Sequence, residues 1–360
     1  MILSAEFKDL RTLKMQANSG RFAVWRYDQL SDYFGGDGKN ILHYRDPSNN
    51  DVSMPFSLDS ELSTPELLIT FDVSEENINV IGEKAFFECR NLQFVNCQSI
   101  SSAEKSAFEG CQSLAYLQTP KLVSVGSCAF SGCLGLENVS LPETLSVCEN
   151  AFAGCRNIVS VYAPKLTDVL SGAFMDCVNL AAVNFPQVSA IGSAAFYCGD
   201  SVSPLSDIEC PNLMRAEPSA FYGCGSLTSV IGVSGLENIE NDMFTDCEKL
   251  KTLTLLSAVR IGQNAMLGCK NLTSLYMPNV AEIGESAFCG CSGLKRIDFG
   301  YTLSAVPALI STAFDGLSGV TFYVPKNSEL YDNWLNDENW SAVMTKNIIY
   351  QHTLAEAQTQ

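Results

Sequence analysis

A phenylalanine recurs every 22 residues from Phe86 to Phe196, and this spacing limits what the chain can fold into. After Phe196 the register continues at intervals of 22 to 26 residues. A fixed period of this size indicates a solenoid, in which each repeat buries its apolar side chains only by stacking on its neighbours. The eleven registers are Phe86, Phe108, Phe130, Phe152, Phe174, Phe196, Phe221, Phe244, Met266, Phe288 and Phe314.

Other fixed positions predict how each turn is built. The sixth and ninth residues after the Phe position are apolar in every register, with Leu205 and Tyr323 as the ninth residues of two irregular repeats. The residue before the Phe position is alanine in ten of the eleven registers, which lets adjacent turns approach closely. The longer intervals after Phe196 and Phe288 carry three and four extra residues, and such insertions map to loops.

A cysteine stands three residues after the Phe position in nine of the eleven registers. Zinc sites commonly use paired C-x-x-C motifs with histidine partners, whereas this chain has no C-x-x-C and only His43 and His352. Parallel Cβ vectors in a stacked column disfavour the torsion of a disulfide. We therefore predict buried, reduced thiols that face backbone carbonyls at a tight turn. The column consists of Cys89, Cys111, Cys133, Cys155, Cys177, Cys224, Cys247, Cys269 and Cys291.

Two further features of the sequence are less strictly repeated: the residue before the column cysteine and the cysteines outside the column. The residue before the column cysteine is glycine in six registers but Glu88, Asp176 or Asp246 in others, so the turn prefers glycine without requiring it. The cysteines outside the column are less constrained, and one oxidised pair among them stays open. They are Cys97, Cys128, Cys148, Cys198, Cys210 and Cys289.

The combined pattern, A-F-x-G-C-x-x-L-x-x-V-x-L-P-x-x-V-x-x-I-G, resembles the BspA-like leucine-rich repeats of bacterial surface proteins over residues 67–350. The resemblance implies an α/β leucine-rich-repeat solenoid of mostly short β-strands with tight turns, a right-handed curved array of about eleven 22-residue repeats. It also implies a partner-binding protein of the cell surface or extracellular space, without catalytic activity. The segment Tyr323-Val324-Pro325 with Tyr331, Trp334, Trp340 and Ile348 resembles the family's C-terminal cap.

The repeat pattern also divides the chain. A solenoid exposes a sheet edge and an open core at each end, and both need covering. We predict an N-terminal cap or docking segment at residues 1–66, the solenoid at 67–325, and a C-terminal cap and tail at 326–360. An independent binding domain at 1–66 is the alternative. The first solenoid strand is expected at residues 67–73, with Val73 in the place that Leu117 takes in its repeat.

Charge and hydropathy limit the partners. The net charge of −18 argues against nucleic acid or an anionic membrane as the main partner. No run of 18 apolar residues is present, so we expect no membrane insertion. Residues 1–8 lack a basic region followed by an apolar run. Either an export signal is not part of this sequence or the protein is not exported by that route, which keeps a virion or cytoplasmic location open.

The residues offer little for catalysis. A serine or cysteine nucleophile generally needs a base beside it, most often histidine, and His43 and His352 lie near opposite ends of the sequence. We expect no catalytic, cofactor or metal site. The remaining enzymatic alternative is a carboxylate-based hydrolase, because 40 acidic residues offer many pairs.

Binding has a clearer candidate surface. The neighbours of each inward Val95-type residue point away from the core, on the inner curve of the solenoid. Their Tyr, Ser, Asn and Thr content resembles adaptable antibody paratopes, although any exposed strand tolerates these residues. We predict recognition of a protein or glycan ligand here. The alternative is a structural or receptor-binding subunit of a virion or appendage, with the solenoid as spacer. The candidate residues are Phe94, Asn96, Tyr116, Gln118, Asn138, Ser160, Tyr162, Asn184, Ser274, Tyr276, Arg296 and Asp298.

Overall fold

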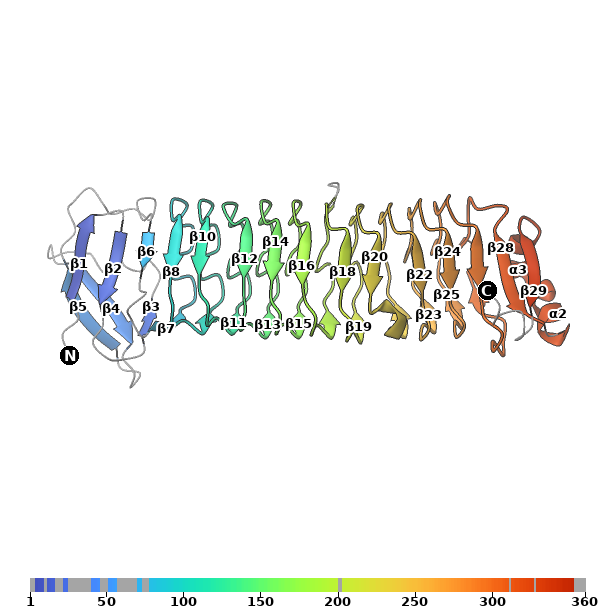
Figure 1. The fold of residues 1–360 in the computed structure, drawn as a ribbon, viewed down its shortest axis with the longest axis horizontal. Coiled ribbons are helices and arrows are strands. Elements are labelled where there is room, and N and C mark those ends of the chain that lie inside the picture. Colours follow the sequence, from blue (N-terminus) through green and yellow to red (C-terminus); the bar gives the residue numbers. More distant parts are fainter. Residues whose placement is uncertain are drawn as a thin grey trace. The chain divides into compact units, whose positions relative to one another are not determined.

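The computed structural model describes residues 78–199, 203–310, 312–326 and 328–352, preceded by strands at 4–9, 12–16, 22–24, 40–45, 51–56 and 70–72. The chain divides into two compact units, Met1–Phe185 and Pro186–Gln360. Each unit stacks turns of one kind, which contain a three-residue strand, a two-residue strand and a tight turn with the Phe position (Figure 1). We call the faces that these three parts form sheet 1, sheet 2 and the turn face. The chain is a parallel-strand β-solenoid of about eleven turns.

In the first unit each strand pairs in parallel with the equivalent strand one turn away. Tyr116, Leu117 and Gln118 lie opposite Phe94, Val95 and Asn96, for example. Sheet 1 contains β6 Thr70–Asp72, β8 Phe94–Asn96, β10 Tyr116–Gln118, β12 Asn138–Ser140, β14 Ser160–Tyr162 and β16 Ala182–Asn184. Sheet 2 contains β7 Ile78–Ile81, β9 Ser102–Ala103, β11 Ser124–Val125, β13 Ser146–Val147 and β15 Asp168–Val169.

The second unit repeats this plan and ends in two helices. Its sheet 1 contains β18 Asp207–Glu209, β20 Ser229–Ile231, β22 Thr252–Thr254, β24 Ser274–Tyr276, β26 Arg296–Asp298, β28 Thr321–Pro325 and β29 Ile348–His352. Its sheet 2 contains β17 Ala190–Ile191, β19 Arg215–Ala216, β21 Asn238–Ile239, β23 Arg260–Ile261, β25 Glu282–Ile283 and β27 Ala308–Leu309. The helices are η2 Val233–Gly235, α2 Ser328–Asn336 and α3 Glu338–Met344.

The strands of the N-terminal segment continue both sheets. β1 (Ser4–Asp9) pairs antiparallel with β2 (Thr12–Gln16), and β2 pairs in parallel with β6. β3 (Phe22–Val24) pairs in parallel with β7. β4 (Asn40–Arg45) and β5 (Asp51–Phe56) form an antiparallel hairpin. The side chains of residues 1–66 and the tail at 353–360 lie outside the described residues, so a cap at 1–66 stays a prediction.

The C-terminal segment packs two tryptophans against the last turns. Trp334 of α2 and Trp340 of α3 are both fully buried, with ring centroids 4.4 Å apart. Both rings contact Phe299. The indole N–H of Trp340 donates to the Pro307 carbonyl at 2.7 Å, and Asp337 caps α3. After α3 the chain adds β29 alongside β28. Both Trp residues that the sequence pattern named therefore belong to the core, as their burial shows.

The Phe column forms the expected stack within each unit. Consecutive rings from Phe86 to Phe174 lie 5.1 to 5.5 Å apart with interplanar angles of 3 to 7°. In the second unit Phe221 stacks on Phe244 at 5.4 Å. These distances are close to the strand spacing of about 4.8 Å, so one ring per turn fits the repeat without a gap. The predicted ladder is confirmed.

The column cysteines bind one turn to the preceding one. The thiols of Cys111, Cys133 and Cys155 donate to the carbonyls of Phe86, Phe108 and Phe130 at 3.0 to 3.2 Å. All nine column cysteines are buried, and none of the fifteen cysteines, which all lie in the described part of the chain, forms a disulfide. Burial raises the pKa of Cys111 and Cys133 well above the usual value, so these groups stay protonated donors. The predicted orientation of the thiols toward carbonyls is confirmed.

The turn face has its own hydrogen-bond ladder, which the periodicity did not predict. The N–H groups of Phe86 and Glu88 donate to Ala107 and Glu109 of the next turn, both at 2.7 Å. Lys84 and Glu88 adopt left-handed backbone conformations, with φ of 56° each. The residue before the column cysteine keeps this conformation whether it is glycine, Glu88, Asp176 or Asp246, so the prediction that glycine is favoured without being required is confirmed.

Three register predictions are wrong. Ile208, not Leu205, lies opposite Val230, and Phe322, not Tyr323, lies opposite Ile297. At the first strand, Phe71 and not Val73 takes the place opposite Val95. In each case the loop before or after the strand differs in length from the regular repeat. The alternation of inward and outward side chains along the strand then determines which residue faces the core. Counting residues from the Phe position does not give this register.

Replacing a central ring tests the stack. We expect Phe152→Ala to lower the free energy of unfolding by about 3–5 kcal/mol, because the ring is fully buried and its loss leaves a cavity between two neighbours. Chemical denaturation measures this change. Tyr162→Ala, at a half-exposed ring one strand away, is the control and should have little effect. Equal effects of the two substitutions would contradict the stacked core.

A second test uses the left-handed turn at Gly154, where φ is 70° and no neighbouring atom lies within 4 Å of the position that a Cβ would occupy. Gly154→Val should destabilise the protein by about 1–2 kcal/mol through backbone strain alone. Gly154→Asp should cost less, because Asp176 already occupies the same place one turn later. Thermal melting of both variants checks the difference, and equal melting temperatures would refute the strain argument.

The thiols provide a third test. In native protein at pH 8 a thiol reagent should label at most the half-buried Cys128, Cys148 and Cys289, since the other twelve are buried. Denaturant without reductant should then expose all fifteen. Column cysteines that stay unreactive after denaturation would have to be disulfide bonded.

Candidate functional site

In the first unit the outward residues of sheet 1 form rows of exposed polar and aromatic groups. The Tyr116 side chain is 65% exposed and that of Tyr162 is 50% exposed, which makes them the largest exposed groups of this face. Gln118, Asn138 and Asn184 are exposed, while Phe94, Asn96 and Ser160 are half-buried. The predicted outward orientation of these residues therefore agrees with the structure.

Several of these side chains contact one another across turns. The rings of Phe94 and Tyr116 lie 6.2 Å apart in a tilted arrangement. The Ser160 hydroxyl donates to the Asn138 amide oxygen at 2.6 Å. Such contacts hold neighbouring side chains in fixed positions before any partner binds.

The sheet 1 ladder is interrupted next to Tyr116. β10 pairs with β8 and β12 pairs with β14, but no pairing joins β10 to β12 in residues 78–185. The Thr119 hydroxyl at this break is buried without a hydrogen-bond partner. The repeat length stays at 22 residues here, so the sequence spacing carries no sign of the break.

In the second unit the same face carries a preformed cation and aromatic contact. The Arg296 guanidinium lies over the Tyr323 ring, with Cζ 3.9 Å from the centroid, and donates to the Asp298 carboxylate at 2.8 Å. The other Asp298 oxygen accepts from the Gly300 N–H at 2.8 Å. Cation–π contact and a charge-assisted hydrogen bond together fix the guanidinium.

The prediction that Asp298 points away from the core into solvent is wrong, because its side chain is buried. Strand pairing places Tyr276 and Tyr323 on either side of Asp298, so two rings and Arg296 cover the carboxylate. Burial, followed by the charge of Asp298 and the neighbouring Tyr301, raises the pKa of Tyr276. Asp298 therefore positions Arg296 and does not present itself to solvent.

The aromatic row extends beyond the predicted residues. Tyr350 of β29 lies opposite Tyr323, with ring centroids 5.2 Å apart. Tyr301 and Tyr350 are each 42% exposed. In the sequence, Ile348, Tyr350 and His352 occupy every second position, as the residues on one face of a strand do. This spacing is the signal that would have identified β29. We call Tyr276, Arg296, Asp298, Tyr323 and Tyr350 the C-terminal aromatic cluster, and Ser274 is half-buried beside it.

Among the described residues, no three or more His, Cys, Asp or Glu side chains gather as metal ligands. No helix in the described part of the chain is long and apolar enough to cross a membrane.

Comparison with known proteins gives matching repeats and structures. The BspA type leucine rich repeat region matches residues 68–169 and 190–321 in six copies. A leucine-rich repeat protein from Bacteroides ovatus is 19% identical, covers 98% of both chains and has a TM-score of 0.52. A leucine rich cell surface protein from Faecalibacterium prausnitzii is 20% identical over 81% of this chain and 90% of its own, with a TM-score of 0.35.

A search of curated proteins returned no match. The Bacteroides ovatus structure supports the fold alone at this identity. The repeat match covers more than half of the chain. The chain therefore belongs to the BspA type leucine-rich repeat family.

Proposed function

We propose that this protein is a non-enzymatic binding protein that recognises a protein or glycan partner on the outward face of sheet 1. The leucine-rich repeat solenoid is a fold typical of binding and adhesion proteins, and its repeat family consists of scaffolds without enzymatic activity. The observation that carries the proposal is the exposure of Tyr116 and Tyr162 on strands that are each hydrogen-bonded to neighbouring turns, Tyr116 in the β8–β10 ladder and Tyr162 in the β12–β14–β16 ladder. Family membership also favours a cell-surface or extracellular location.

Rigidity is the physical advantage of such a face. Within each paired run of strands, a turn presents its outward side chains about 4.8 Å from those of the next turn, so binding orders little that was mobile before. A tyrosine buries a large amphipathic surface at the loss of only two side-chain torsions. Its ring suits the apolar face of a sugar as well as an apolar protein group.

The C-terminal aromatic cluster supports the same proposal in the second unit. Tyrosine and arginine are the residue types enriched at binding hot spots. Arg296 is already held by Asp298 and Tyr323, at 2.8 Å and 3.9 Å, so it does not have to be ordered by the partner. Each unit thus supplies its own anchors on sheet 1.

The charge of the chain indicates which partners fit. A net charge of −18 repels nucleic acid and anionic membranes. Neutral glycans and neutral or basic protein surfaces avoid this repulsion. We therefore place the partner in one of those two classes.

Truncating the two exposed rings tests the proposal. Tyr116→Ala combined with Tyr162→Ala should leave the melting temperature nearly unchanged, because both rings are at least half exposed. Binding should weaken at least about tenfold, since hot-spot truncation typically costs about 2 kcal/mol or more. Binding to immobilised glycans and extracellular matrix proteins, measured for wild type and variant, gives the comparison.

Leu145→Ala, at a half-exposed leucine directly before β13 of sheet 2, is the matched control and should bind as wild type does. A second variant, Tyr276→Ala with Tyr350→Ala, tests the C-terminal aromatic cluster. Full binding by both double variants would refute the sheet 1 proposal. Loss of binding only after deletion of residues 1–66 would assign the function to that segment, with the solenoid as spacer.

A further inference from the structure

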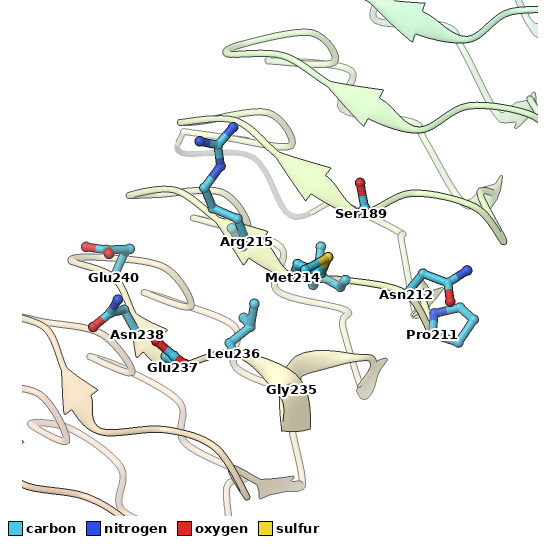
Figure 2. Close-up of a pocket in the computed structure, with 12 residues that line it drawn as sticks. Ser189, Pro211, Asn212, Met214, Arg215, Gly235, Leu236, Glu237, Asn238 and Glu240 are labelled. Carbon is cyan, nitrogen blue, oxygen red and sulfur yellow. The ribbon is translucent and has the colours of Figure 1, made fainter.

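Sheet 2 of the second unit is interrupted between two turns. β17 pairs with β19 and β21 pairs with β23, but no pairing joins β19 to β21 in residues 203–310. A cleft of about 830 Å³ lies at this place. Figure 2 shows Met214 and Arg215 on the β19 side and Leu236, Glu237 and Asn238 on the β21 side. The cleft lies on sheet 2, away from the sheet 1 face proposed above for partner binding.

The intact turns show which hydrogen bonds are missing at the cleft. On the far side of β21, the N–H groups of Val259 and Arg260 donate to the Glu237 carbonyl at 2.8 and 3.3 Å. On the near side of β19, the N–H groups of Met214 and Arg215 donate to the Ser189 carbonyl at 2.9 and 3.2 Å. The ladder is therefore regular up to each edge of the cleft.

Across the cleft the equivalent bonds would run from Glu237 and Asn238 N–H to the Met214 carbonyl, and from Glu240 N–H to the Ala216 carbonyl. None of these bonds is present within residues 203–310. Three backbone donors and two acceptors therefore lack the strand that would normally pair with them. Unpaired strand edges of this kind are templates for an added strand.

The chain is well packed on both sides of the cleft. On one side the 3₁₀ helix η2 replaces the regular corner, and Gly232 enters it with φ of 112°. A side chain at Gly232 would collide with the Cys210 carbonyl, so the chain is closely packed here. On the other side the turn face is intact, since Ser219 N–H donates to the Asn241 carbonyl at 2.9 Å. The cleft is a local gap between two well-packed corners.

The side chains at the cleft combine apolar and acidic character with one cation, Arg215, which pairs with Glu217 at 3.8 Å. Met214 is 79% exposed, the largest exposed fraction among the exposed large hydrophobic residues of the described chain. Leu213 and Leu236 also line the cleft and are buried. Glu237 is exposed, and no ion pair of its carboxylate is found in the described part of the chain, whereas Glu240 pairs with Arg260 at 3.9 Å. A basic side chain would complement Glu237.

We propose that this cleft binds an extended peptide segment of a partner protein by strand addition. The peptide backbone pairs with the free N–H and carbonyl groups of β19 and β21. An apolar side chain of the peptide packs on Met214, and a basic side chain lies beside Glu237. Backbone pairing supplies affinity and these two side chains supply selectivity, as in other strand-addition complexes.

The test begins with the full chain and a phage-displayed library of random linear peptides. Selected peptides are synthesised, and their affinities for wild type and variants are measured by fluorescence anisotropy. We expect enriched sequences to combine an apolar and a basic residue. Met214→Ser should weaken their binding at least about fivefold. Leu145→Ser, at the same place in an uninterrupted ladder, is the matched control and should change nothing.

Glu237→Pro and Glu237→Gln distinguish the contribution of the Glu237 N–H to peptide binding from that of the Glu237 carboxylate charge. Proline removes the Glu237 N–H, keeps the carbonyl that Val259 and Arg260 use, and suits the extended Leu236 before it, with φ of −74° and ψ of 129°. It should weaken binding about tenfold, a change typical of one lost hydrogen bond with an unpaired partner. Glutamine keeps the N–H and should only reduce the preference for basic peptides.

Peptides with single N-methylated amides test strand addition without changing the protein. Methylation should weaken binding at every central position of the peptide, because a strand between β19 and β21 directs alternate N–H groups to each of the two edges. Binding that tolerates methylation at every position would overturn the proposal. Selection that yields no peptide sensitive to Met214→Ser would overturn it as well. Should Glu237→Pro fail to fold by circular dichroism, the Met214→Ser and methylation results decide the question.

Discussion

The dependence of every turn on the next is the constraint from which the rest of this structure follows. A single 22-residue turn cannot enclose its own apolar side chains, and stacking solves this with one phenylalanine ring per turn about 5 Å from the next. The column cysteine adds a second tie, because its thiol donates to the phenylalanine carbonyl of the preceding turn. Burial raises the pKa of Cys111 and Cys133 and keeps both thiols protonated, so these donors persist. Ring, thiol and backbone ladder therefore act on the same pair of neighbouring turns.

Because the inward residues and the backbone maintain the stack, the outward residues are free to serve recognition. Tyr116 and Tyr162 stand on sheet 1 without a role in the core, and Arg296 is fixed by Asp298 and Tyr323 in the second unit. Fixed positions reduce the entropy lost on binding, which favours a surface of this kind over flexible loops. The proposed function follows from this separation of tasks between the two sides of each strand.

The breaks in the ladders show the other way in which such a chain gains binding groups. Between β19 and β21 the turn face stays closed while the sheet 2 bonds are lost, so backbone donors and acceptors become available beside exposed Met214. The break between β10 and β12 leaves the Thr119 hydroxyl unpaired within the core of the first unit. An irregular turn in a regular array thus exposes groups that every other turn uses internally.

The amino-acid sequence by itself determined the repeat length, the stacked Phe column, the buried thiols and the outward direction of most sheet 1 residues. These features depend on spacing, and a period that recurs eleven times averages out local exceptions. Tertiary structure alone decided the register of the irregular turns, since loops of unequal length placed Ile208 and Phe322 at the inward strand positions that counting assigns to Leu205 and Tyr323. It also decided the burial of Asp298 between two rings and the cleft beside Met214, because both arise from the positions of neighbouring turns, which the spacing within one turn does not contain.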